Sequence, residues 1–193
     1  MSIKLRDWQK KAVDTIAEAL KSPHSKVAIN ACVGSGKTFV PFEAIVQFIN
    51  NHTEDKTFHV FVCPRIRLCK QQAKEAEYLF KARGVNVTVK IWNSDDTDPK
   101  SIGSKIVKDN EPFWDSKAKH VLCVICDESL WGLQKKKDNH GKDKSYSRYD
   151  RFEAMLNNNI TYNRINGIIA YDEAHNYTQK QKYMLGNELY KEA

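Results

Sequence analysis

A glycine-rich string that can wrap phosphate groups is the most informative feature of the chain. Gly34, Ser35 and Gly36 come directly before Lys37 and Thr38. Glycines let the backbone curl so that successive N–H groups face inward, and these groups hold phosphate oxygens together with the N-terminus of a following helix. Lys37 would then reach the β- and γ-phosphates, and the Thr38 hydroxyl would bind Mg²⁺. The string therefore predicts a phosphate loop.

A second string can place a metal and a water beside those phosphates. Asp172 and Glu173 follow an apolar segment, Gly167 to Tyr171, that is typical of a short strand. Asp172 would hold Mg²⁺, and Glu173 would position and polarise an attacking water. The alternative is that both residues only cap the next helix, because Asp favours N-cap positions. The phosphate loop elsewhere in the chain favours the metal site.

The spacing of apolar residues predicts the elements that must position these groups. Helical spacing is found over 7–21, 37–50 and 68–82, with Pro41 in a first turn and Gly84 as a stop. Short apolar or alternating runs predict strands at 26–30, 59–63, 85–91, 120–126 and 167–171. Strands that alternate with helices predict an α/β fold with a mostly parallel central sheet. Both strings follow predicted strands, so we expect them at one edge of that sheet.

Composition bounds the class of protein. The 193 residues suffice for one domain with a core. The longest apolar runs, such as 121–126, fall far short of the ~20 residues of a membrane-spanning helix, and the N-terminus has no signal-peptide core. We therefore expect a cytoplasmic protein with no membrane partner. The formal net charge of +7 favours a polyanionic partner.

Two further features have competing interpretations. Cys123 and Cys126 form a CxxC pair, but in a buried strand residues three apart point to opposite faces, which favours core thiols over a zinc site. Residues 93–119 and 134–149 lack apolar periodicity. We predict a flexible basic loop over 134–149, with a nucleic-acid contact as the alternative.

In combination, these strings resemble the motifs of superfamily 2 helicases. Ala31 to Thr38 resembles motif I, in which alanine commonly takes the first position, and Asp172 to His175 resembles motif II of the DEAH variety. Leu5 to Gln9 resembles the Leu-Arg-x-x-Gln signature of the Q motif, as found in members similar to type III restriction enzyme translocases. Pro64 to Gln71 is similar to motif Ia. The motifs occur in the order of the family, from Leu5 to His175.

The resemblance implies a RecA-like P-loop NTPase fold of three layers that uses ATP and Mg²⁺. It implies that Gln9, assisted by Arg6, reads the adenine edge, and that His175 links the nucleotide state to the nucleic-acid site. Arg65, with Ser129 as a weaker second candidate, would touch the backbone of a nucleic acid, and DNA is favoured over RNA. The expected nucleotide-binding residues are Arg6, Gln9, Gly34, Ser35, Gly36, Lys37, Thr38 and His175; the catalytic ones are Lys37, Asp172 and Glu173; the metal ligands are Thr38 and Asp172.

Motors of this superfamily have two RecA-like domains with ATP between them. After motif II we recognise neither the usual Ser-Ala-Thr strand nor a second domain with arginine fingers. We therefore expect residues 1–193 to form one C-terminally incomplete domain, the ATP-binding half of a nucleic-acid-dependent motor, which is weak or inactive alone. One alternative is a truncated RecA-like module that binds or regulates a protein without motor activity. Another is a small nucleotide kinase, which the Q motif and the context of His175 disfavour.

Overall fold

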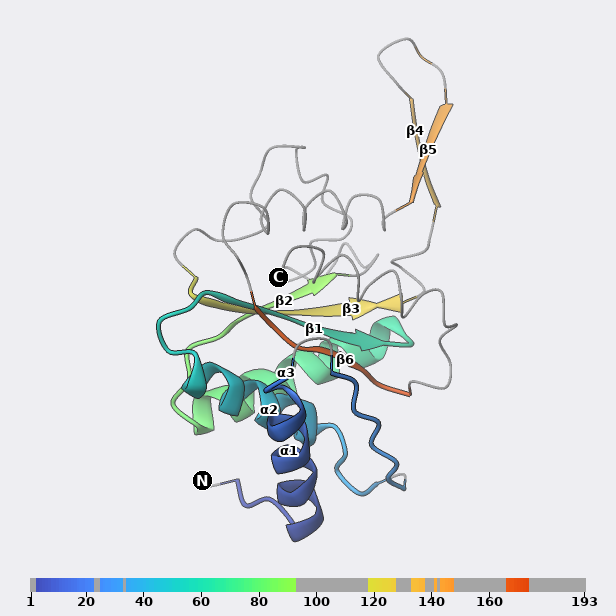
Figure 1. The fold of residues 1–193 in the computed structure, drawn as a ribbon. Coiled ribbons are helices and arrows are strands. Elements are labelled where there is room, and N and C mark those ends of the chain that lie inside the picture. The colour runs from blue at the N-terminus through green and yellow to red at the C-terminus, as the bar shows by residue number, and fades with distance from the viewer. Residues whose placement is uncertain are drawn as a thin grey trace.

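A four-stranded parallel sheet with helices on one face forms the body of the protein (Figure 1). The computed structural model describes residues 3–22, 25–32, 34–92, 118–127, 133–137, 141, 143–147 and 166–173. The sheet has the order β2-β3-β1-β6. Its strands are β1 (Thr57–Cys63), β2 (Thr88–Trp92), β3 (His120–Cys126) and β6 (Ile169–Tyr171), and the helices are α1 (Asp7–Ala19), α2 (Phe39–Asn51) and α3 (Ile66–Ala82).

The two central strands are buried along their whole length. Every residue of β1 and of β3 is buried, as the continuous apolar runs of these segments predict for a parallel sheet. Their register runs from Thr57 opposite His120 to Cys63 opposite Cys126, so both strands end at the same edge. β6 pairs with the other side of β1 and ends at this edge too. The predicted α/β fold with a parallel sheet is confirmed, with strand boundaries shifted by up to three residues.

The predicted helices are confirmed. Aromatic rings pack α2 against the sheet and against α3, and an ion pair joins α3 to α2. The Phe42 ring of α2 lies 4.9 Å from the Phe61 ring of β1 and 6.3 Å from the Phe80 ring of α3, between centroids. Arg83 Nε donates to both carboxylate oxygens of Glu43, at 2.8 and 3.0 Å, and so joins the end of α3 to α2. These contacts fix the start of α2, where the phosphate loop ends.

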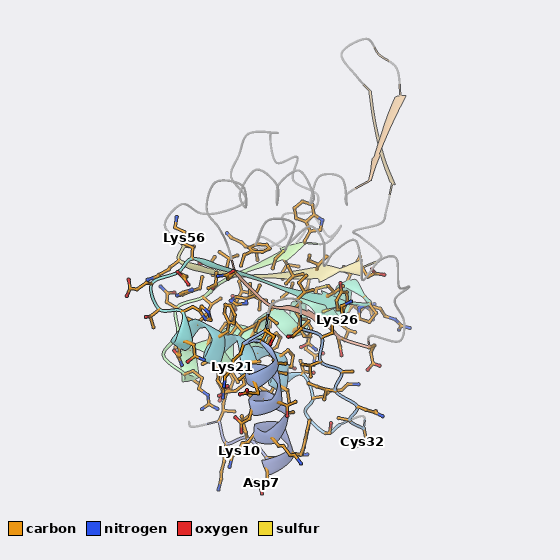
Figure 2. All side chains as sticks on the ribbon, in the orientation of Figure 1. Asp7, Lys10, Lys21, Lys26, Cys32 and Lys56 are labelled. Atoms are coloured by element: carbon orange, nitrogen blue, oxygen red, sulfur yellow. The ribbon has the colours of Figure 1, made fainter. Side chains whose placement is uncertain are left out.

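The predicted strand over 26–30 is wrong. In the structure this segment forms no strand, and Val27 and Ile29 are 40% and 38% exposed. Figure 2 shows Lys26 closer to the sheet than Cys32, so the chain runs away from the sheet toward the loop. Alternation of apolar residues indicates one apolar face, but a strand also requires a neighbour whose N–H and C=O groups pair with its own. Within the described residues, the four strands of the sheet pair without this segment.

The lysine-rich stretch at 134–149, predicted as a loop, contains β-structure. β4 (Leu133–Lys137) and β5 (Asp143–Ser147) pair in antiparallel fashion, with Leu133 opposite Ser147 and Lys137 opposite Asp143. Five residues join the strands, and among them Gly141 has a φ of 76°. A five-residue connection with a glycine is typical of a hairpin. Lysine is uncommon in strands, so composition concealed this signal.

Three further features concern the cysteines of β3, possible metal-binding groups and membrane-spanning helices. Cys123 and Cys126 are buried in β3, as predicted for core thiols, and burial raises the pKa of the Cys123 thiol well above its usual value. No group of three or more His, Cys, Asp or Glu residues that could hold a metal ion occurs in the described ranges. None of the helices described above is long and apolar enough to cross a membrane.

A buried polar network fixes β6 against the centre of the sheet. His59 Nδ1 accepts the N–H of Ile168 at 3.1 Å, so the ring proton lies on Nε2, which donates to Thr57 Oγ1 at 2.9 Å. The Thr57 hydroxyl then donates to His120 Nδ1, also at 2.9 Å. Next to this network, Gly167 passes so close to β1 that a Cβ would lie 1.7 Å from the carbonyl oxygen of Phe58. This anchor was not predicted from the sequence, although a histidine inside an apolar strand is an unusual signal.

The neutral state of His59 predicts a loss of stability in acid. Burial lowers the pKa of His59 from 6.5 to about 3, so the unfolded chain takes up a proton that the folded chain excludes. The free energy of unfolding therefore falls as the pH drops from about 6.5 toward 3, by up to about 1.4 kcal/mol per pH unit from this group. Urea unfolding at pH 7 and pH 5 should show a smaller loss for His59→Gln. An equal loss in both proteins would contradict the assignment.

Candidate nucleotide site

The glycine-rich string forms a curled loop directly before α2. Gly34 and Gly36 have φ values of 76° and 81°, in the left-handed region that glycine adopts without steric cost. Ser35 N donates to the carbonyl of Cys32 at 3.3 Å, which closes the turn. Thr38 stands at the N-cap of α2, and its hydroxyl makes no capping hydrogen bond. The positive end of the helix dipole therefore follows the loop, as phosphate binding requires.

A buried hydroxyl supports a phosphate ligand in this loop. Ser35 is 8% exposed, and its Oγ has no hydrogen-bond partner in the part of the chain that the structure describes. An unpaired buried hydroxyl costs about 1–3 kcal/mol, and a phosphate oxygen is an acceptor that would remove this cost. The curled backbone, the helix N-terminus and Ser35 thus fit the phosphates of a nucleotide.

The acidic string meets the loop in space. Asp172 N donates to the Val62 carbonyl at 2.9 Å, which extends the pairing of β6 with β1 as far as the first acid. Lys37 Nζ lies 2.7 Å from Glu173 Oε1, and both side chains are about one third exposed. Glu173 has a φ of 52°, a conformation that costs a residue with a Cβ roughly 1–2 kcal/mol. The structure thus brings together the two strings that the sequence analysis selected.

Lys37, Asp172 and Glu173 form one electrostatic cluster. The hydrogen bond with Glu173 raises the pKa of Lys37, and the charge of Asp172 adds to this rise. Loss of solvent raises the pKa of Asp172, the charge of Glu173 raises it further, and Lys37 opposes both effects. A phosphate that binds Lys37 would therefore compete with Glu173 for the hydrogen-bond donors of the ammonium group. The Asp172 carboxylate and the Thr38 hydroxyl are hard oxygen donors, which fit Mg²⁺.

Arg6 and Gln9 contact the backbone of the loop. Gln9 is buried; its Nε2 donates to the Gly36 carbonyl at 2.8 Å, and its Oε1 accepts the N–H of Arg6 at 2.8 Å. The Arg6 guanidinium donates to the Ser35 carbonyl at 3.2 Å. Both residues were predicted to contact adenine, and their role as supports of the loop was not predicted from the sequence. An adenine contact stays a prediction.

The other predicted residues have separate locations. Arg65 is exposed at the start of α3, two residues beyond the end of β1, and so lies at the edge where the strands end. Ser129 and His175 lie outside the described residues, as does most of the 93–119 segment.

The fold and the site define a class of protein. The parallel α/β sheet and the comparison with known protein families together define a RecA-like, helicase-like domain of superfamily 2. Residues 2–192 match the family described as "Type III restriction enzyme, res subunit", and the chain belongs to this family.

One solved structure supports the same fold. The chain is similar to a nuclease-deletion mutant of the Type ISP restriction-modification enzyme LlaGI, solved in complex with a DNA substrate mimic. The TM-score is 0.55 at 15% identity, and the match covers 88% of this chain and 17% of that one. At this identity the likeness concerns the fold alone. A comparison with curated proteins found no match.

The support of the loop by Gln9 predicts that two glycines differ in their tolerance of alanine. Both Gly34→Ala and Gly36→Ala place a Cβ at positive φ, which costs roughly 1–2 kcal/mol. At Gly36 the Cβ also lies 2.9 Å from Gln9 Nε2, whereas at Gly34 nothing lies within 4 Å. Urea unfolding should therefore show a larger loss of stability for Gly36→Ala.

Removal of Gln9 provides the control. In a Gln9→Ala background the two alanine variants should lose similar stability, because the steric conflict is gone. If the full difference between them persists in that background, Gln9 is not its cause.

Proposed function

We propose that this chain binds and hydrolyses ATP as part of a motor that acts on DNA. The observation that carries the proposal is the contact between Lys37 and Glu173, which joins a phosphate-binding loop to a carboxylate able to act on water. Membership of a helicase-like family supports a nucleic-acid-dependent ATPase module in general. The structural neighbour was solved with a DNA substrate mimic, and DNA rather than RNA is part of this proposal.

The residues of the site have distinct roles in this proposal. Lys37 leaves Glu173 and binds the β- and γ-phosphates, while the N–H groups of the loop hold the phosphate oxygens. Thr38 and Asp172 hold Mg²⁺, which supplies charge neutralisation at the phosphates. Glu173, released from Lys37, positions the attacking water and accepts its proton. In this proposal the ion pair between Lys37 and Glu173 exists before the nucleotide binds. Nucleotide binding replaces it with a contact between Lys37 and the phosphates and a contact between Glu173 and the attacking water.

A nucleotide base that contacts Gln9 would also affect the glycine-rich loop, because Gln9 is hydrogen-bonded to that loop. Within the described residues, the Gly36 carbonyl accepts one of the two amide hydrogens of Gln9, and in this proposal the other donates to the base. We propose that adenine binds there, with Arg6 beside it, and thereby adjusts the position of Gly36. His175 completes the DEAH string and is proposed to link this site to the nucleic acid.

Two substitutions test the proposed hydrolysis. Lys37→Ala should weaken ATP binding, whereas Glu173→Gln should retain binding and reduce DNA-stimulated turnover by about 10²–10⁴-fold, the usual value of a general base. Phosphate release and binding of a fluorescent ATP analogue, each with and without duplex DNA, provide the measurement in the full protein. Glu54→Gln, an exposed acid far from the loop in sequence, serves as the matched control. Unchanged turnover in both site variants would sink the proposal.

The position of Arg65 predicts a loss of DNA affinity on substitution. Arg65→Ala should weaken binding of oligonucleotides of unrelated sequence to the same extent and reduce the salt slope by about 1, because backbone contacts carry no sequence information. Arg67→Ala removes the same charge from the exposed face of α3 and should have less effect. Fluorescence anisotropy across a salt series measures both, and an RNA oligonucleotide tests the preference for DNA. Equal losses in the two variants would contradict a specific contact at Arg65.

A further inference from the structure

The β4–β5 hairpin concentrates positive charge. Its ten strand residues include four lysines, Lys135, Lys136, Lys137 and Lys144, and one acid, Asp143. In Figure 1 the hairpin stands away from the sheet, on the side opposite to the N-terminal helix. The predicted role of the site in ATP hydrolysis makes no use of it.

The register of the hairpin sets two lysines against each other. Lys136 is directly opposite Lys144, and Gln134 is directly opposite Tyr146. Because side chains alternate along a strand, these four positions share one face of the hairpin. Like charges directly opposite each other destabilise a strand pair. At the positions of the other face, the register sets Lys137 opposite an acidic residue, Asp143.

The chain connects the hairpin to the edge that carries Arg65. Cys126, the last residue of β3, is in register with Cys63, and Arg65 follows Cys63 by two residues. β4 begins at Leu133, seven residues after Cys126. Seven residues of extended chain span at most about 25 Å. The base of the hairpin therefore lies within that distance of the strand ends next to Arg65.

We propose that the face formed by Gln134, Lys136, Lys144 and Tyr146 is a second contact for the backbone of the DNA that binds at Arg65. The inference rests on the proposed function in one respect, namely that DNA binds this chain. Phosphates would place negative charge against the opposed lysines and remove their repulsion, which an apolar or cationic partner cannot do. The contact is to the backbone and is independent of base sequence.

A double substitution tests this contact. For a duplex oligonucleotide, the logarithm of affinity falls with the logarithm of salt by about 0.9 per neutralised phosphate. Lys136→Ala with Lys144→Ala should therefore make this slope less negative by up to about 1.8, equally for two unrelated sequences. The control, Lys10→Ala with Lys11→Ala, removes the same charge from exposed positions of α1, and Figure 2 shows Lys10 at the opposite end of the molecule from the hairpin. This control should leave the slope unchanged.

A charge reversal separates DNA contact from folding of the hairpin. Lys144→Glu places an acid opposite Lys136, which should favour strand pairing yet weaken DNA binding at low salt at least as much as the double alanine variant. Lys11→Glu is the control of equal charge change. Turnover of ATP without DNA should be unaffected by Lys144→Glu, and the melting temperature should not fall.

The outcomes distinguish this inference from the proposed function. If the unsubstituted protein binds DNA and Lys144→Glu binds it with the same slope and affinity, the hairpin contact is overturned and the motor assignment stands. If the unsubstituted protein binds no DNA at any salt concentration, both are overturned. A reduced slope in the hairpin variants, with both controls unchanged, supports the contact.

Discussion

The contact between Lys37 and Glu173 is the constraint that the rest of the structure has to satisfy. It joins residues 136 positions apart at a nitrogen–oxygen distance of 2.7 Å. Such closeness requires that the start of α2 and the end of β6 be held independently. Both groups are about one third exposed, so solvent screens the pair and its contribution to stability is small. Its importance is therefore positional.

Each side of this contact has its own support. On the basic side, Gln9 and Arg6 hydrogen-bond to successive carbonyls of the phosphate loop, so the N-terminal end of α1 fixes the backbone from which Lys37 extends. On the acidic side, the His59 network and the close passage of Gly167 fix the entry to β6, and the Asp172 N–H continues the pairing at its exit. These supports consist mainly of buried and partly buried hydrogen bonds, and satisfied polar networks of this kind make the local geometry rigid.

The electrostatic cluster links nucleotide binding to the arrangement of the acids. Asp172 is held near another carboxylate and partly out of solvent, and both effects raise its pKa. Lys37 offsets this cost in the structure described above. A ligand that bound Lys37 would remove the positive charge that now compensates Asp172. A divalent cation brought with that ligand would supply a new positive charge beside Asp172. The strained backbone of Glu173 fits a residue held for function, because such conformations concentrate at active sites.

The sequence by itself determined the features that depend on local pattern. Gly34 and Gly36 were identifiable because a curled loop needs left-handed backbone, and the apolar runs in β1 and β3 predicted strands of a mostly parallel sheet. The tertiary structure decided what depends on which distant segments meet. It left 26–30 without strand pairing despite its alternation, and it paired the lysine-rich stretch as a hairpin. It also engaged Gln9 with the loop and His59 with β6. Spacing along a chain reports the conformation of one segment, whereas a hydrogen bond across many residues requires two segments to be placed together, and only the packed fold places them.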